Sequence, residues 1–155
     1  MKTLILVPLE KELDALRDGF KKQGLPLALQ TEGLWLSQCE RILFALGGHG
    51  KAEFAATTQY FIQRLGDITH VICAGSAGAL INKLNIGDIV VSTKTIEHDF
   101  TSRIANIPPP THRATPSLLS AVDQIDENLF HFSIEQDIVA SGEEDIAVSY
   151  THLTL

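Results

Sequence analysis

The 155-residue chain alternates short apolar runs with segments that have helical spacing. Residues 3–8, 41–46 and 71–74 are nearly continuous apolar runs, which predict buried strands. Between these runs, residues 10–22 repeat Leu and Phe every three or four positions, and residues 51–65 place Ala, Ile and Leu along one side. Strands that alternate with helices predict an α/β fold with a mixed sheet.

Further segments complete the expected order of elements. Residues 27–36 are predicted to form one strand, and residues 89–95 and 131–141 two more. Thr115-Pro116 has the N-cap and first-turn signals of a helix that runs to Ile125. The inward face of the helix over residues 51–65 is predicted to consist of Ala52, Ala55, Ala56, Ile62 and Leu65.

Composition and charge narrow the class of protein. Hydrophobic residues make up 45% of the chain and charged residues 20%, which argues against disorder. The formal net charge of −7 disfavours nucleic acid as a partner. Two cysteines are too few for a disulfide framework, and the apolar run near the N-terminus is too short for a signal peptide or a membrane span. We therefore expect a cytoplasmic protein without a membrane partner.

The most informative segment is residues 71–100, in which an apolar run breaks into Gly75-Ser76-Ala77-Gly78. Glycine lets a ligand approach the bare backbone, and consecutive N–H groups in such a turn can converge on an anion or a sugar hydroxyl. The pattern lacks the third glycine of a dinucleotide fingerprint. With Gly87-Asp88 opening a second apolar run, it predicts a ligand site at the end of a buried strand.

For two other segments, the sequence alone does not decide between a functional and a structural role. Gly47 to Lys51 lies between a strand and a helix, where it is either an anion site or a tight turn; it is not a P-loop. Glu10 and Glu12 follow the first strand, and spacing favours a solvated first helical turn over a general base. His98-Asp99 is better interpreted as a hydrogen-bonded pair than as metal ligands, so no metal and no cofactor are expected.

Four segments resemble the nucleoside phosphorylase and nucleosidase superfamily: LVPLEKELDAL, GGHGKAEFAATT, ICAGSAGALINKLNIGDIVVS and IVASGEEDI. The similarity runs from Leu4 to about Ile146 and is greatest to the methylthioadenosine/S-adenosylhomocysteine nucleosidases. It implies a three-layer α/β fold with a central mixed sheet, incomplete at the C-terminus. It also implies hydrolysis of the N-glycosidic bond of a purine nucleoside, as in methionine salvage.

The resemblance assigns roles to individual residues. Glu12 falls on the glutamate that activates the attacking water, and Ser76 lies near the ribose. The substrate-binding positions it implies are Ser76, Ala77, Gly78, Ile146 and Gly48. In the family, the residues that clamp the ribose and protonate the base lie beyond residue 155. We therefore expect residues 1–147 to be the N-terminal part of one domain that is inactive alone, and residues 148–155 to be a non-native tail.

Two departures from the family pattern leave alternatives open. Asp145 replaces a phenylalanine that stacks on the purine, which leaves the base uncertain. Cys73 replaces an arginine common in phosphorylase members, and without that cation water is a better nucleophile than phosphate. The alternatives are a nucleoside phosphorylase and a non-catalytic nucleoside-binding or oligomer-forming module. The family also implies a homodimer or a larger homo-oligomer.

Overall fold

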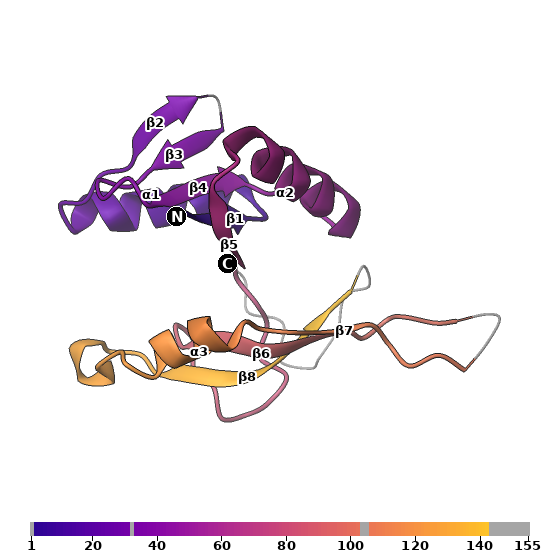
Figure 1. Ribbon diagram of the computed structural model, residues 1–155. Coiled ribbons are helices and arrows are strands. Elements are labelled where there is room, and N and C mark those ends of the chain that lie inside the picture. Colours follow the sequence, from indigo (N-terminus) through magenta and orange to yellow (C-terminus); the bar gives the residue numbers. More distant parts are fainter. Residues whose placement is uncertain (1, 32, 103–105, 143–155) are drawn as a thin grey trace. The chain divides into compact units, whose positions relative to one another are not determined.

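The structure is a computed structural model, and it describes residues 2–31, 33–102 and 106–142. The chain divides into two compact units, Met1–Ala77 and Gly78–Leu155, and each is described by itself (Figure 1). The predictions for Ile146, Asp145 and the tail over 148–155 lie outside the described residues. The assignment of 1–147 to one domain stays a prediction.

The first unit holds a five-stranded mixed sheet with the order β2-β3-β4-β1-β5. Strands β4, β1 and β5 are parallel, whereas β2 and β3 add an antiparallel hairpin at one side. The elements in chain order are β1 (Lys2–Val7), α1 (Glu10–Lys22), β2 (Ala28–Thr31), β3 (Leu34–Leu36), β4 (Ile42–Leu46), α2 (Lys51–Leu65) and β5 (Ile68–Cys73).

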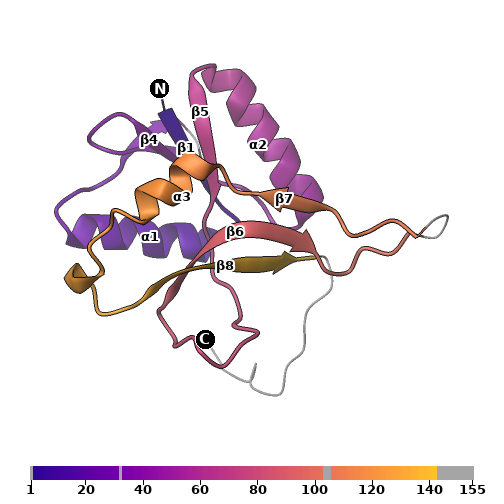
Figure 2. The ribbon, with the colours of Figure 1, turned by 60° about the horizontal axis from the view of Figure 1, so that its bottom comes forward.

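The two helices of this unit cover opposite faces of the sheet (Figure 2). Because side chains alternate along a strand, Leu4 and Leu6 of β1 pack with Phe61 of α2 on one face. Val7 of β1 packs with Leu13 of α1 on the other face, together with Phe44 of β4. The predicted three-layer α/β arrangement is therefore present within the first unit.

One prediction for the first unit is wrong, and another is right only in part. Residues 27–36 are not one strand but the hairpin β2–β3, which reverses at Gly33 because its φ of +75° suits a tight turn. The predicted inward face of α2 is right for Leu65, which packs against the core, and Ile62 is half-buried, but Ala52, Ala55 and Ala56 are exposed. Phe54 and Phe61 take inward positions in place of the alanines, because an aromatic ring removes far more apolar area from water than a methyl group does.

The second unit holds a three-stranded sheet with the order β7-β6-β8, where β6 and β8 are parallel and β6 and β7 antiparallel. Its elements are β6 (Ile89–Glu97), β7 (Thr111–Arg113), α3 (Pro116–Val122), a short 3-10 helix (Glu127–Leu129) and β8 (Ile134–Ser141). Helix α3 starts at the predicted Pro116 but ends at Val122, before Ile125. No helix in the described ranges is long and apolar enough to cross a membrane.

Asp88 ties the start of β6 to the start of β8. Its Oδ2 accepts a hydrogen bond from the Asn85 N–H at 2.7 Å, and its Oδ1 accepts one from the Ser133 N–H at 3.0 Å. These bonds lower the pKa of Asp88, because they stabilise its ionised form. The Gly-Asp turn is therefore a structural link between two strands of the second unit.

Candidate functional site

The three parallel strands of the first unit end at the same edge of the sheet. The Gly47 N–H donates to the Val7 carbonyl at 2.7 Å, and the Ala74 N–H donates to the Leu6 carbonyl at 2.9 Å. Since β1 lies between β4 and β5, the chain segments that follow all three strands meet at this edge. Open α/β sheets bind their ligands outside the carboxyl ends of their strands.

Glu12 is held at this edge by hydrogen bonds to both of its carboxylate oxygens. Oε1 accepts the N–H of Ser76 at 2.7 Å and also the Ser76 hydroxyl. Oε2 accepts the N–H of Leu9, the residue that precedes α1, at 3.2 Å. The structure therefore brings together Glu12 and Ser76, two of the residues predicted from the sequence.

The hydrogen bonds decide the charge of Glu12. Partial burial acts to raise its pKa, but the bonds from the Ser76 hydroxyl, the Ser76 N–H and the Leu9 N–H outweigh burial and leave the pKa below its ordinary value. The carboxylate is therefore ionised at neutral pH. An ionised carboxylate beside an accessible edge can accept a proton from a water molecule.

Gly75 makes this arrangement possible. A Cβ at this position would lie 3.1 Å from Cδ of Pro8 and 3.2 Å from Oε2 of Glu12. Both distances are tighter than ordinary van der Waals contact, so any side chain here would press on the carboxylate. The first glycine of the Gly75–Gly78 segment is therefore needed for close approach.

The Gly47–Gly50 turn lies at the end of β4, and Gly48 has a φ of +93°. The N–H of His49 donates to Oε2 of Glu53 at 3.0 Å, and the Glu53 side chain fills the space where a Cβ of Gly48 would lie. One of the donors expected to face an anion is thus already bonded to a carboxylate of α2. A ligand-binding role for Gly48 stays a prediction.

The remaining predicted residues are spread over both units. Ala77 ends the first unit and Gly78 begins the second. Cys73 at the end of β5 is exposed. Desolvation of the thiol and the negative charge of Glu12 raise its pKa, so it is a poor nucleophile.

His98 and Asp99 lie after β6 in the second unit. The His98 N–H donates to the Ser141 carbonyl at 2.9 Å, and a Cβ on Gly142 would collide with both side chains. Across the described ranges, no group of three or more His, Cys, Asp or Glu is placed to hold a metal ion. The pair thus contacts the turn that follows β8.

Sequence reasoning missed two contributors to the site, Gly75 as a packing requirement and the Leu9 N–H as a donor. The sequence carries a signal for the Leu9 N–H, because Glu12 stands three residues after the residue that caps α1, which is the spacing of a capping box. Leu9 has no side-chain acceptor, so only the half of the box that involves the Glu12 carboxylate forms. The sequence carries no signal for the contact of Gly75 with Glu12, because that contact depends on β5 lying beside β1.

The fold and the sequence together define the class of the protein. Residues 2–147 match the family model of the phosphorylase superfamily, and the chain belongs to this family. The curated relatives include the 5′-methylthioadenosine/S-adenosylhomocysteine nucleosidases of Bacillus licheniformis, 26% identical over 153 residues, and Bacillus pumilus, 27% identical over 153 residues. Each comparison covers 92% of this chain and 65% of the relative, so the chain spans about two thirds of the relatives' length.

Solved structures share the fold. The Neisseria meningitidis 5′-methylthioadenosine/S-adenosylhomocysteine nucleosidase in complex with methylthio-immucillin-A matches 97% of this chain and 69% of its own, with a TM-score of 0.72 and 23% identity. The futalosine hydrolase of Helicobacter pylori matches 97% of this chain and 70% of its own, with a TM-score of 0.71 and 20% identity. These likenesses confirm the predicted α/β fold.

Proposed function

We propose that the protein of this chain hydrolyses the N-glycosidic bond of a purine nucleoside of the methylthioadenosine or S-adenosylhomocysteine type. The observation that carries the proposal is the ionised carboxylate of Glu12, held by Ser76 and Leu9 at the carboxyl edge of the parallel strands. The family and the names of the curated relatives support the substrate class.

In the proposed reaction, Glu12 takes a proton from water while the water oxygen bonds to the anomeric carbon of the ribose. The bond between that carbon and the purine nitrogen breaks, and its electron pair leaves with the base. Ser76, with Ala77 and Gly78 next to it, would lie beside the sugar. The departing base must gain a proton, and we assign no residue of the described chain to that role.

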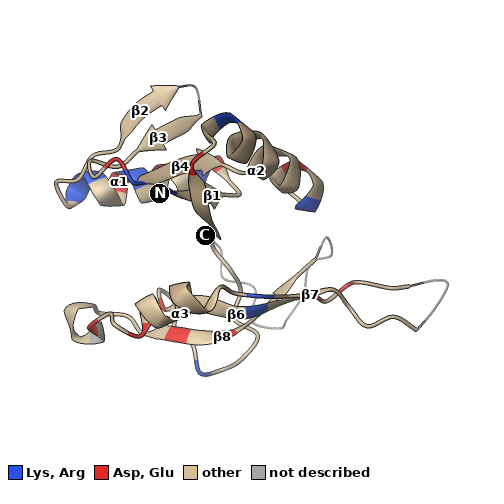
Figure 3. Cartoon of the chain, viewed as in Figure 1, with Lys and Arg blue, Asp and Glu red and all other residues tan. Residues whose placement is uncertain are grey.

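Water is a better nucleophile than phosphate at this edge. The negative charge of Glu12 repels a phosphate anion, and Cys73 supplies a thiol that is neutral at pH 7. Phosphorolysis needs cations on the attacking anion. Figure 3 shows that this unit carries charges of both signs. Lys21 and Lys22 lie in the last turn of α1, whereas Glu12 lies in its first turn.

The test is the release of free adenine from methylthioadenosine, measured with and without phosphate. It uses the 155-residue chain and the same chain followed by the C-terminal third of the Bacillus licheniformis relative. We expect phosphate-independent release by the longer protein and little or none by the shorter one. Glu12→Gln should lower release by about 10²–10⁴-fold, with unchanged circular dichroism as the control.

Two other outcomes would contradict the proposal. Release that needs phosphate and yields 5-methylthioribose 1-phosphate would make the protein a phosphorylase. Saturable binding of methylthioadenosine without release, in a longer protein with cooperative unfolding, would make it a non-catalytic nucleoside-binding module. We also propose that the longer protein is a homodimer or a larger homo-oligomer, which light scattering tests directly.

A further inference from the structure

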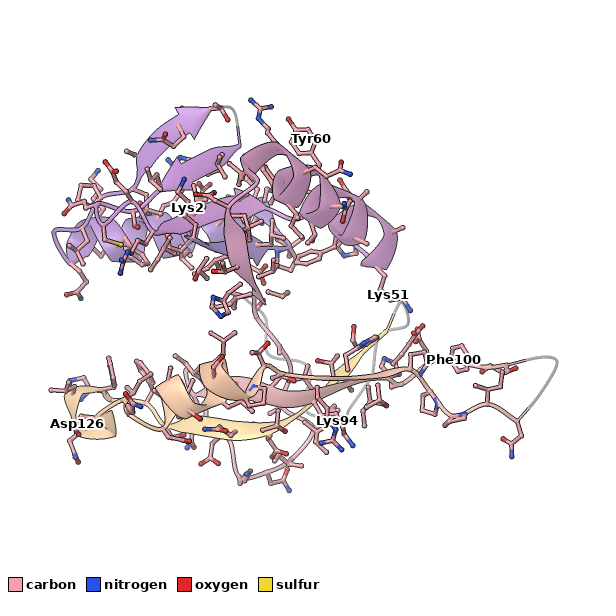
Figure 4. The ribbon with its side chains drawn as sticks, viewed as in Figure 1. Lys2, Lys51, Tyr60, Lys94, Phe100 and Asp126 are labelled. Carbon is pink, nitrogen blue, oxygen red and sulfur yellow. The ribbon has the colours of Figure 1, made fainter. Side chains whose placement is uncertain are left out.

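Two cations face each other across the antiparallel strands β6 and β7 of the second unit. Lys94 and Arg113 are register partners, so their side chains leave the same face of the sheet. Figure 3 shows a blue segment on each of these strands, and Lys94 is labelled in Figure 4. Lys94 is half-buried and Arg113 is exposed. Like charges directly opposite each other weaken a strand pair, so this pairing carries a cost that a neutral residue would avoid.

The hydrogen bonds of the ladder bring these two side chains close together. The Ala114 N–H donates to the Thr93 carbonyl at 3.1 Å, one position before the pair of Lys94 with Arg113. Hydrogen-bonded and non-hydrogen-bonded pairs alternate along antiparallel strands, so Lys94 and Arg113 form a non-hydrogen-bonded pair. The Cβ atoms of such a pair are about 5 Å apart. One small anion can therefore contact both cations at once.

No acidic side chain of the described residues neutralises this pair. Among these residues, ion pairs hold Lys2, Arg17 and Lys83. Neither Lys94 nor Arg113 has an ion pair within the described part of the chain. Acids are not scarce, because the chain carries 19 acidic against 12 basic side chains. Two adjacent cations that break a local pairing rule without a counterion favour a binding site for an external anion.

An apolar side chain continues the row onto the third strand. Lys94 is also in register with Ile138 of β8, whose side chain is 51% exposed. Arg113, Lys94 and Ile138 thus lie side by side on one face of the sheet. A guanidinium binds two oxygens of a phosphate group through its paired N–H donors, and an ammonium adds a point charge. The row therefore fits a doubly charged anion that has an apolar part.

We propose that Arg113 and Lys94 bind the phosphate group of a small phosphate monoester, with Ile138 in contact with its apolar part. The two positive charges match the dianion, and the bound phosphate offsets the repulsion between the two side chains by attracting each of them. All three residues belong to the second unit, and binding is measured without turnover. The outcome is therefore independent of the proposed nucleosidase activity.

The 155-residue chain is titrated with phenyl phosphate above pH 7, where the monoester is a dianion, and amide NMR follows β6, β7 and β8. Inorganic phosphate keeps the charge without the ring, and benzyl alcohol keeps the ring without the charge. We expect saturable shifts centred on Lys94, Arg113 and Ile138, severalfold weaker binding of inorganic phosphate and none of benzyl alcohol. Equal affinity for inorganic phosphate would overturn the role of Ile138.

Single substitutions test the two cations. We expect Arg113→Gln and Lys94→Gln each to weaken binding by about tenfold or more. Arg113→Lys should restore part of the loss, because it keeps the charge without the paired donors. Lys21→Gln in the first unit is the matched control, since it changes the net charge equally and should leave binding unchanged. Without ligand, Arg113→Gln should be no less stable to urea than the parent, because it removes a like-charge contact.

Two results would overturn the proposal. Shifts that do not saturate, or affinity lost equally in the Lys21→Gln control, would show attraction to charge in general and no site. A folded Arg113→Gln variant that binds phenyl phosphate as tightly as the parent would exclude the pair as its binding site.

Discussion

At the scale of single residues, the candidate site depends on which effect controls the Glu12 carboxylate. Burial alone would favour the protonated acid, but hydrogen bonds from Ser76 and Leu9 favour the ionised form and prevail. The same bonds fix the direction in which the carboxylate points. Charge and orientation thus have one origin, the hydrogen bonds from Ser76 at the end of β5 and from Leu9 before α1.

The first prediction concerns the close approach of Gly75 to Glu12. Gly75→Ala places a Cβ 3.2 Å from the carboxylate and 3.1 Å from Pro8, so one of them must move. We expect a loss of about 1 kcal/mol in the free energy of unfolding, measured by urea denaturation. In the same assay Gly19→Ala is the control, since a Cβ on Gly19 in α1 meets nothing within 4 Å.

The Gly19→Ala control should change stability in the opposite direction. Alanine is favoured over glycine in a helix interior by about 0.5–1 kcal/mol. Equal effects of the two substitutions would contradict the packing role of Gly75.

The second prediction is a pH dependence. Glu12 has a pKa of about 4.3 when unfolded and a lower one when folded. Its ionised form therefore stabilises the fold fully above the unfolded value, and the contribution is lost as the pH falls through the folded value. We expect the stability difference between the parent and Glu12→Gln to be largest at neutral pH and to shrink in acid.

Urea unfolding at several pH values measures this difference. Asp88 and Asp137 also have lowered pKa values, but they are present in both proteins and cancel in the comparison. A difference that stays constant from neutral pH into acid would show that the hydrogen bonds do not depend on the charge of Glu12.

At the scale of elements, the sequence predicted what depends on local periodicity. Both long helices begin and end where their apolar spacing and flanking glycines indicate, and β1 and β4 follow their apolar runs. The hairpin β2–β3 was missed because apolar residues stand on both sides of the polar segment over residues 30–33. The inward face of α2 was missed because alanines at helical spacing mark a stripe next to the one that holds Phe54 and Phe61.

The third prediction tests that face of α2. Phe61 is 6% exposed in the core cluster with Leu4 and Leu6, so Phe61→Ala should lower the free energy of unfolding by about 3–4 kcal/mol. Gln59→Ala on the exposed side of the same helix should change it by less than about 0.5 kcal/mol. Similar losses from the two variants would mean that the face has been misplaced.

At the scale of the whole molecule, the two sheets that the described residues form share no strand. The sequence predicted an α/β fold with mixed pairing, and that is confirmed, but it could not show where one sheet ends because both are built from similar apolar runs. Glu12 and Ser76 were predicted separately through the family resemblance. Their contact was not, because it arises only when β5 pairs with β1.

The fourth prediction is that the two units respond separately to substitution. Asp88→Ala removes the acceptor of the Asn85 and Ser133 N–H groups in the second unit. We expect severalfold faster amide hydrogen exchange in β6 and β8, with exchange in β1 and β4 unchanged. Phe61→Ala should give the reverse pattern, and faster exchange throughout the chain in both variants would show one cooperative unit.

The contact between Glu12 and Ser76 spans 64 positions of the chain. During synthesis Glu12 leaves the ribosome long before its partner exists, and until then its carboxylate is an ordinary solvated acid. The parallel pairing of β5 with β1 must come first, and it is a slow, non-local step. The proton affinity of this one side chain therefore records whether the first unit has finished folding.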